Sequence, residues 1–204
     1  MCNSLRYDMR SLFMRKIDAA VSAAGLATFA ATSSPSCAPA HSAVCIFSAV
    51  PGQPDAGVRG VVRFTQVKTE AKVRVHVKVS GLPPNTTHGL HVHALGNLVE
   101  GCISAGGHFN PDNSPHGGPT DAASARHAGD LGNVRADASG VVDVCITDEL
   151  VSLAGSRSII GRSIVLHADE DDYGRGGHAD SKTTGHAGAR IACGVIGLDA
   201  DVDA

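Results

Sequence analysis

The fold is decided by an alternating stretch, Lys72-Val73-Arg74-Val75-His76-Val77-Lys78-Val79, in which every second residue is a valine. Successive side chains of a β-strand point to opposite faces, so this pattern predicts a strand with a buried valine face and a wet polar face. Seven other β-rich runs lie at about 42–50, 58–67, 87–95, 131–137, 141–147, 159–167 and 190–198. Turn-forming Gly and Pro residues separate the runs, and no long helical pattern competes with them. The sequence therefore predicts an all-β fold of eight strands.

The composition is compatible with this fold class, and it excludes several other classes of protein. The chain has 204 residues, of which 43% are hydrophobic and 18% charged, so it is neither a disordered polymer nor a charge-rich coiled coil. Its length suits one domain with an additional segment. A net charge of -3, with Lys and Arg scattered, argues against a nucleic-acid partner. The unusual feature is the presence of eleven histidines and six cysteines, since histidine in such number points to metal ligation or proton chemistry.

Residues 1–40 differ from the rest of the chain and predict an N-terminal targeting or leader segment before a domain that spans 41–204. Four basic residues precede a stretch rich in Ala and Ser, and its apolar part is too short to cross a bilayer, which needs roughly 20 residues. Ala38-Pro39-Ala40 suits a signal peptidase, whereas the Arg and Ser content also suits an organellar transit peptide. Secretion and organelle import therefore both stay open, and an uncleaved extension would leave the protein cytoplasmic.

Loss of this leader would change the charge of the protein and bear on its glycosylation. Four basic and two acidic residues would be removed, so the net charge would move from -3 to -5. The domain would then be acidic. Asn85-Thr86-Thr87 is an N-glycosylation sequon, which has meaning only if the chain is secreted.

Two long stretches, about 96–130 and 168–189, break the rhythm of the strands and are rich in Gly, His and Asp. Structureless loops of this length inside a compact domain are uncommon and usually functional. His91 and His93 precede the first loop and lie two apart on a predicted strand, so their rings project from the same face. Alone, such a pair is more often surface decoration than a metal site.

Further candidate ligands follow along the chain: His108, His116, His127, Asp130 and, at the end of an apolar run, His167. Imidazoles with one carboxylate suit zinc or copper, whereas calcium and magnesium prefer shells made of oxygen. With His91 and His93 these make seven potential ligands, which is too many for one four-coordinate ion. Two ions that share one ligand would use all of them.

Eight segments of the chain resemble the copper/zinc superoxide dismutases, in order and in register. They are Gly89–His93, Gly101–Gly106, His108–Pro111, His116–Pro119, His127–Asn133, Ile159–Arg162, Asp171–Asp172 and Arg190–Gly197. The similarity extends over about 42–198. It implies a homodimer and a flattened, eight-stranded Greek-key β-barrel, an immunoglobulin-like sandwich architecture with two long functional loops.

The resemblance also implies a copper site and a zinc site that share His108. Carried over by position, the copper ligands fall on His91, His93, His108 and His167, and the zinc ligands on His108, His116, His127 and Asp130. His108 would be the catalytic bridge between the two ions. Asp171 would orient one ligand of each metal, His91 and His116. The guanidinium of Arg190 would attract and position an anionic substrate.

The cysteines and the second loop complete what the resemblance implies. A disulfide between Cys102 and Cys193 would tie the first loop to a barrel strand, whereas Cys45 and Cys145 lie in strand patterns and are expected to be buried free thiols. The segment Ala179–Lys182 departs from a common form of the family, because Ala179 replaces an acidic residue and the lysine is displaced by one position. Its part in steering the substrate stays open, and Thr184 is the better-matched residue of the channel wall. No ligand role is assigned to the remaining histidines, which are His41, His76, His88, His178 and His186.

The residues and the resemblance together predict a superoxide dismutase, which converts two superoxide anions and two protons to dioxygen and hydrogen peroxide. The alternative is a superoxide-dismutase-like domain of a copper chaperone, but the chain has no Cys-x-x-Cys motif and keeps Arg190 and all copper ligands. A zinc hydrolase is disfavoured because His-Glu-x-x-His is absent. The expected partners are superoxide, a second copy of the chain and a copper chaperone that assists loading, with neither nucleic acid nor membrane.

Overall fold

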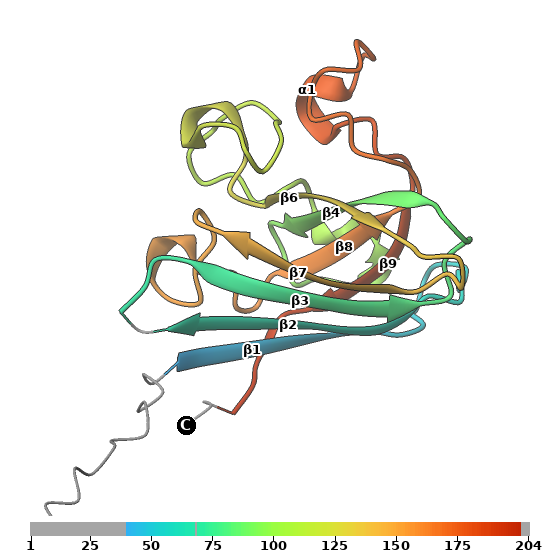
Figure 1. Cartoon of the computed structure of the whole chain (residues 1–204), viewed down its shortest axis with the longest axis horizontal. Coiled ribbons are helices and arrows are strands. Elements are labelled where there is room, and N and C mark those ends of the chain that lie inside the picture. The colour runs from blue at the N-terminus through green and yellow to red at the C-terminus, as the bar shows by residue number, and fades with distance from the viewer. Residues whose placement is uncertain (1–39, 68, 201–204) are drawn as a thin grey trace, which may run out of the picture. The chain divides into compact units, whose positions relative to one another are not determined.

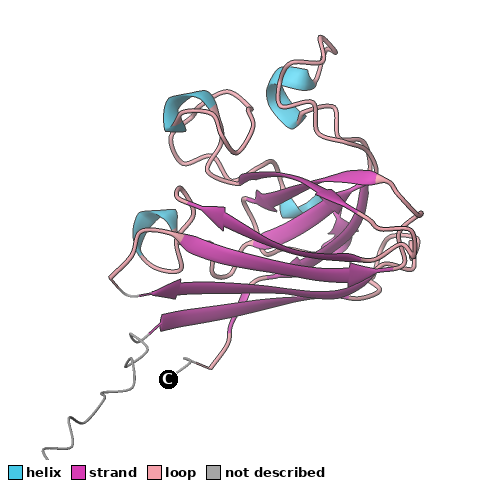
Figure 2. Cartoon of the chain, viewed as in Figure 1, coloured by secondary structure: helices cyan, strands magenta, loops and turns pink. Residues whose placement is uncertain are grey.

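Two antiparallel sheets build the part of the chain that the computed structural model describes, residues 40–67 and 69–200 (Figures 1 and 2). The first sheet has the order β10-β1-β2-β3-β7, with bounds β1 Ala40–Phe47, β2 Arg59–Val67, β3 Val73–Ser80, β7 Val142–Asp148 and β10 Gly197–Leu198. The second has the order β6-β4-β8-β9, with bounds β4 Thr87–His93, β6 Asp130–Arg135, β8 Ser163–His167 and β9 Arg190–Val195. The leader predicted at 1–40 lies outside the described residues, apart from Ala40.

The alternation along the strands produces a core between the two sheets. All four valines of β3 are buried, as the alternating stretch predicts. Val75 pairs in register with Phe64 of β2, and Leu90 of β4 and Ile164 of β8 join the same hydrophobic cluster from the second sheet. Each sheet therefore turns one aliphatic face inward, which is the arrangement expected of a sandwich of antiparallel sheets.

The described residues form ten strands, which are the eight predicted and two further short ones, and the all-β class is confirmed. β5 (Val99–Cys102) lies inside the predicted first loop and belongs to neither sheet, and β10 pairs with β1 through two residues. Both are too short for a periodic pattern to mark them. The helical segments are equally short: η1 Ile103–Ala105, η2 Ala123–Ala125, η3 Gly155–Arg157 and α1 Ser181–Thr184. Within the described ranges no helix has the length and apolarity needed to span a membrane.

The connections between the sheets are of the Greek-key kind. β7 pairs with β3, not with β6, which precedes it in the sequence. The chain therefore leaves the second sheet after β6 and returns to the edge of the first. β6 and β7 each have a neighbour on one side only, and both are edge strands.

The two long loops extend beyond the β6–β4 side of the second sheet (Figure 1). The first connects β5 to β6 and the second connects β8 to β9. His116 of the first loop donates its backbone N–H to the Lys182 carbonyl of the second, at 3.1 Å. Arg175 of the second loop forms an ion pair with Asp121 of the first, at 2.5 Å. The two loops are thus linked by both backbone and side-chain contacts.

Candidate metal centre

Three of the candidate ligands stand on the two central strands of the second sheet. His91 and His93 are on β4, which pairs with β6 on one side and β8 on the other, and both are fully buried. His167 is the last residue of β8. Because ladder hydrogen bonds hold both strands on both sides, the backbone fixes the places of these three rings.

The other four candidate ligands come from the first loop and its end. His108 forms an isolated β-bridge with His93, so the beginning of the loop lies against β4. His116 and His127 follow in the loop, and Asp130 is the first residue of β6. All four are buried.

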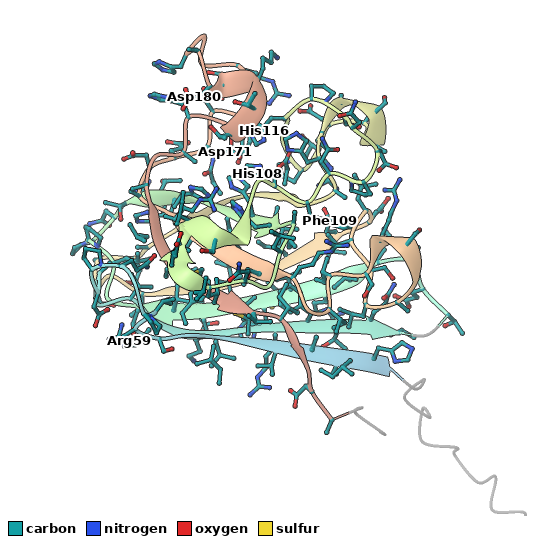
Figure 3. The ribbon with its side chains drawn as sticks, turned by 180° about the vertical axis from the view of Figure 1, so that it is seen from behind. Arg59, His108, Phe109, His116, Asp171 and Asp180 are labelled. Atoms are coloured by element: carbon teal, nitrogen blue, oxygen red, sulfur yellow. A yellow bond between two sulfur atoms is a disulfide. The ribbon has the colours of Figure 1, made fainter. Side chains whose placement is uncertain are left out.

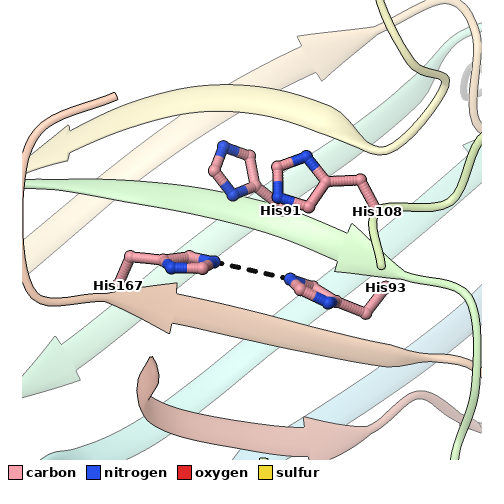
Figure 4. Close-up of side chains that lie close together, drawn as sticks. All are labelled: His91, His93, His108 and His167. Atoms are coloured by element: carbon pink, nitrogen blue, oxygen red, sulfur yellow. Dashed lines mark hydrogen bonds between the residues drawn. The ribbon is translucent and has the colours of Figure 1, made fainter. Parts of the chain in front are cut away.

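The structure brings the seven side chains together in two groups that share His108. One group is His91, His93, His108 and His167, and the other is His108, His116, His127 and Asp130, with the ligand atoms of each group within 4.8 Å of one another. Figure 4 shows the four imidazoles of the first group facing one another, with the Nε2 atoms of His93 and His167 3.4 Å apart. These are the two sets that the sequence predicts.

Four of the histidines each use one ring nitrogen to hold an acceptor outside the groups. His91 Nε2 and His116 Nε2 lie 2.7 and 2.8 Å from the two oxygens of Asp171. His93 Nδ1 lies 2.8 Å from the Gly106 carbonyl, and His167 Nδ1 lies 3.2 Å from the Gly188 carbonyl. These contacts fix the rings, because a ring nitrogen bonded to an acceptor carries the proton and leaves the other nitrogen with a free lone pair.

Within the described part of the chain, three other ring nitrogens of the two groups lack any hydrogen bond. His91 Nδ1, His108 Nε2 and His116 Nδ1 are buried without a hydrogen-bond partner among the described residues. A buried polar atom without a partner is costly. Imidazole lone pairs that converge in a buried space are suited to a transition metal, so the donor set fits copper or zinc.

Asp130 is the centre of the second group. Its Oδ1 lies 2.9 Å from His108 Nδ1 and 3.1 Å from His127 Nδ1, and its Oδ2 accepts the backbone N–H of His127 at 2.9 Å. His116 Nδ1 is 3.1 Å from the same Oδ2, although the angle is not that of a hydrogen bond. Three imidazoles around one carboxylate form a ligand set of the kind that zinc takes.

The protonation states also fit metal ligands. Burial lowers the pKa of His91 to about 3 and that of His167 to about 4, with His108 nearby adding to both shifts. Burial alone would raise the pKa of Asp130, but its close contacts with His108, His116 and His127 hold that pKa well below its usual range. The first group therefore favours neutral imidazoles, and Asp130 of the second group favours the ionised form, and these are the forms that bind metals.

His116 differs from His91 and His167 in the direction of its pKa shift. Burial lowers its pKa, but the carboxylates of Asp130 and Asp171 outweigh burial and raise it to about 9. Figure 3 shows Asp171 close to His116 and His108, below the loop that carries Asp180. Asp171 is itself buried and in contact with one histidine of each group, so it connects the two groups as the resemblance implied.

Arg190 lies beside the first group. It is the register partner of His167 across β8 and β9, and its Nη1 donates to the Cys102 carbonyl at 2.8 Å. Its charge contributes to the lowered pKa values of His93 and His167, after burial and the charge of His108. The half-buried guanidinium also lines a surface pocket with Gly188 and Ile103. A cation is thus placed at the surface, on the strand that pairs with β8 at His167.

The divergent segment of the second loop forms α1 and the residues before it. Lys182 contributes its carbonyl to the backbone of His116, whereas the exposed Thr184 bonds only to the carbonyl of Asp180 within its own segment, at 3.3 Å. His178 and His186 stack on each other at the surface with 3.7 Å between ring centroids, and His186 is bonded to Asp180. These residues stand outside both ligand groups.

The cysteine predictions are partly correct. The disulfide between Cys102 and Cys193 is present, with 5.7 Å between the Cα atoms, and Cys45 is buried, which raises its pKa to about 12. The prediction that Cys145 is buried is wrong, since it is exposed on β7. Cys145 shares the outer face of this edge strand with Asp143 and Thr147, and the period of two in β7 would have placed it there.

Several residues that hold the centre carry no sequence signal of that role. The carbonyls of Gly106 and Gly188 accept from two of the histidines, but any residue could offer a carbonyl. Arg126 donates Nη1 to the Asp130 carbonyl at 2.9 Å and forms a buried ion pair with Asp148. Because these contacts join segments distant in the sequence, only the folded arrangement reveals them.

Comparison with known proteins covers this same region. The family model for copper/zinc superoxide dismutase (SODC) matches residues 58–196. A relative named Superoxide dismutase (Cu-Zn), from Yarrowia lipolytica (strain CLIB 122 / E 150), is 52% identical over 146 residues, which are 72% of this chain and 94% of the relative. The crystal structure of the clock protein EA4 matches with a TM-score of 0.71 and 45% identity, over 78% of this chain and 94% of that chain. The residues that the family model matches include both loops and all seven candidate ligands.

Proposed function

Because this chain belongs to the copper/zinc superoxide dismutase family, we propose that its seven buried ligands hold one copper ion and one zinc ion that share His108. Family membership makes the chain an oxidoreductase that converts two superoxide anions and two protons to dioxygen and hydrogen peroxide. Its cofactors are those of the family, copper and zinc. The observation that carries the assignment is the pair of buried ligand groups with one common histidine.

The copper ion would be held by Nδ1 of His91 and by Nε2 of His93, His108 and His167. Four imidazole nitrogens suit copper, which accepts a tetragonal nitrogen shell. The assignment is supported by the free nitrogens of His91 and His108 and by the hydrogen bonds that occupy the opposite nitrogens of His91, His93 and His167.

The zinc ion would be held by Nδ1 of His108, His116 and His127 and by Oδ1 of Asp130. The only carboxylate among the seven ligands lies in this group, and zinc accepts nitrogen and oxygen donors in a closed four-ligand site. His108 would then use both ring nitrogens, one for each ion, and Asp171 would hold the outer nitrogens of His91 and His116.

When bound, copper would supply a one-electron redox couple and zinc a fixed charge that holds the loop ligands. The protein supplies the remaining chemistry. Arg190 attracts superoxide and positions it beside the first ligand group. His108 can hold a proton at Nε2 and give it to the product of the second superoxide, whose other proton comes from water. Burial of the ligands excludes bulk water from the reacting anion.

We also propose two protein partners of the enzyme, a second copy of the chain and a copper chaperone. Six large apolar side chains are exposed on β1, β9, β10 and the region of β5, and they are Ile46, Leu95, Val99, Ile103, Val195 and Leu198. Exposed apolar groups of this kind favour association, so we expect a homodimer that covers them. A copper chaperone would assist loading as a transient partner. The complete ligand set and Arg190 favour the dismutase over a chaperone domain, in which no complete site is needed.

The cellular compartment of the protein depends on residues 1–40. Their composition supports a leader for secretion or for import into an organelle, and without its function the protein would stay in the cytoplasm. Glycosylation of Asn85 would occur only in the first case. Asn85 lies in the turn between β3 and β4 with a positive φ of 62°.

Metal analysis of Asp130→Asn tests the division of the ligands. The change removes the carboxylate of the zinc group and leaves the four copper nitrogens in place, so zinc affinity should fall while copper affinity is retained. Asp143→Asn is the matched control, because this carboxylate lies on the outer face of β7. Titration of the metal-free proteins with each ion measures both affinities, and equal loss of the two metals would contradict the assignment.

A further inference from the structure

Arg126 and Asp148 form an ion pair inside the protein, although neither belongs to the seven ligands. Arg126 Nη2 lies 2.5 Å from Asp148 Oδ2, and the side chains are only 3% and 2% exposed. Charged residues are rarely buried to this degree unless they are paired. The pair adjoins the proposed zinc group, because Arg126 directly precedes His127.

Each partner is held on its own side by further hydrogen bonds. Asp148 Oδ1 accepts the backbone N–H groups of Leu150 and Val151, at 2.7 and 2.9 Å. Arg126 Nη1 donates to the Asp130 carbonyl at 2.9 Å. The guanidinium therefore joins the carboxylate at the end of β7 to the backbone of a proposed zinc ligand.

The pair connects two places that no sheet ladder connects. Asp130 begins β6, an edge strand of the second sheet, and Asp148 ends β7, an edge strand of the first sheet. The turn from His127 to Asp130 carries two of the proposed zinc ligands. Inside this turn the Asp130 side chain accepts the backbone N–H of His127, but the contact between Arg126 and Asp148 attaches the turn to the opposite sheet.

Stability alone is a poor explanation for this arrangement. Desolvation of two charges can cost as much as their attraction returns, and apolar side chains of similar size often replace such a pair without loss. Arg126 Nε is also buried without a partner among the described residues. What the arginine provides is geometry, since its rigid planar fork reaches two acceptors at once, which a lysine ammonium on a flexible stem does not.

We propose that Arg126 is a positioning residue, which holds the turn His127–Asp130 in the conformation needed for zinc through its ion pair with Asp148. Zinc binding then depends on this pair, whereas copper binding does not, because three of the copper ligands stand on β4 and β8. The proposal rests on the zinc assignment made above. It deepens that assignment by naming what fixes the loop ligands before the ion arrives.

The test is the double variant Arg126→Met/Asp148→Asn, in which no unpaired charge is buried and the asparagine oxygen can still accept from Leu150 and Val151. Zn²⁺ alone is titrated into the metal-free chain against a competing chelator, and Cu²⁺ is titrated separately. Removal of an outer partner of a metal ligand typically weakens metal binding about 10- to 100-fold, and this is the loss expected for zinc, with copper changed by less than about threefold. Arg63→Met is the matched control, because it removes another arginine–aspartate ion pair, with Asp199, that lies on the first sheet and touches no ligand of the centre.

A double variant that binds zinc within about threefold of the unaltered chain would overturn the proposal, even if its melting temperature falls. Arg126→Lys provides a second measurement if the double variant does not fold, since it keeps the charge opposite Asp148 and loses the second hydrogen bond. It should also bind zinc more weakly, and unchanged zinc affinity would overturn the proposal as well. If the unaltered chain itself binds no zinc, the zinc assignment fails, and that result is distinct from a failure of Arg126 alone.

Discussion

Three of the proposed copper ligands stand on strands in the middle of a sheet, whereas all four proposed zinc ligands stand on a loop or at its end. His91, His93 and His167 are placed by the ladders of β4 and β8. His116 and His127 are placed by side-chain contacts, above all those made by Asp171 and Asp130. The copper half is therefore built into the fold, and the zinc half depends on a small number of individual contacts.

One metal centre can therefore combine ligands on rigid strands with ligands on a loop whose position depends on a few contacts. A ladder strand loses its position only when the sheet opens, but a loop loses its position when one of its ties is removed. Three such ties are the disulfide at Cys102, the Asp171 carboxylate and the Arg126–Asp148 pair. Changes to these ties should affect zinc more than copper.

The largest effect is expected for His108→Ala, because this residue is the only ligand shared by the two halves. Loss of the group that moves a proton in the reaction typically costs about 10²- to 10⁴-fold in rate, and we expect turnover to fall in this range while the fold survives. Decay of pulse-generated superoxide at matched copper content measures it. His76→Ala, on the first sheet, is the control. Near-normal turnover of the loaded His108 variant would remove the bridge from the mechanism.

Cys102→Ser tests the tie at the start of the loop. The disulfide closes a segment of 91 residues, and the loop-entropy model gives roughly 4 to 5 kcal/mol of stability for a bridge of that span. Denaturant unfolding should therefore show a large loss, accompanied by weaker zinc binding. Cys145→Ser is the control, because this thiol is free and exposed. Equal unfolding midpoints for the Cys102 variant and the oxidised parent would argue against the tie.

Asp171→Asn compares the two halves directly, since the carboxylate contacts His91 and His116 at nearly equal distances of 2.7 and 2.8 Å. We expect zinc affinity to fall about 10- to 100-fold and copper affinity to fall less, because β4 still holds His91. Competitive metal titration measures both values. Asp172→Asn serves as the control, since that side chain bonds within its own loop. Equal losses would show that the strand gives copper no advantage.

Arg190→Glu addresses the approach of substrate to the copper half and has the smallest expected effect. A charged cleft can raise association rates by about 10- to 10³-fold, and we expect a loss near the lower end, with a flattened or reversed dependence on salt. Superoxide decay across ionic strengths measures it. Arg63→Glu gives the same change of net charge at an exposed position on β2. Parallel salt curves for the Arg190 variant and the parent would exclude a steering role.

The sequence was sufficient for the eight longer strands and for the residues that meet in the two ligand groups. The alternation of valines in β3 is a local property, and each of the eight predicted runs became a strand. The spacing of His91 and His93 and the surplus of seven ligands pointed to two ions through residue types and positions alone. The resemblance correctly supplied the disulfide partners. Cys145 could also have been assigned to the exposed face, because the sequence alone gives its position in the two-residue period of β7.

The tertiary structure alone decided how those parts are held. β10 exists because its two residues meet β1, and the carbonyls of Gly106 and Gly188 reach His93 and His167 only in the folded domain. The pairing of Arg126 with Asp148 depends on how two edge strands of different sheets approach each other. Periodicity reports which face of its own strand a residue occupies, but it carries no information on what lies opposite that face. Contacts between loops are set by the packing of the whole domain, and so they become visible only when the chain is folded.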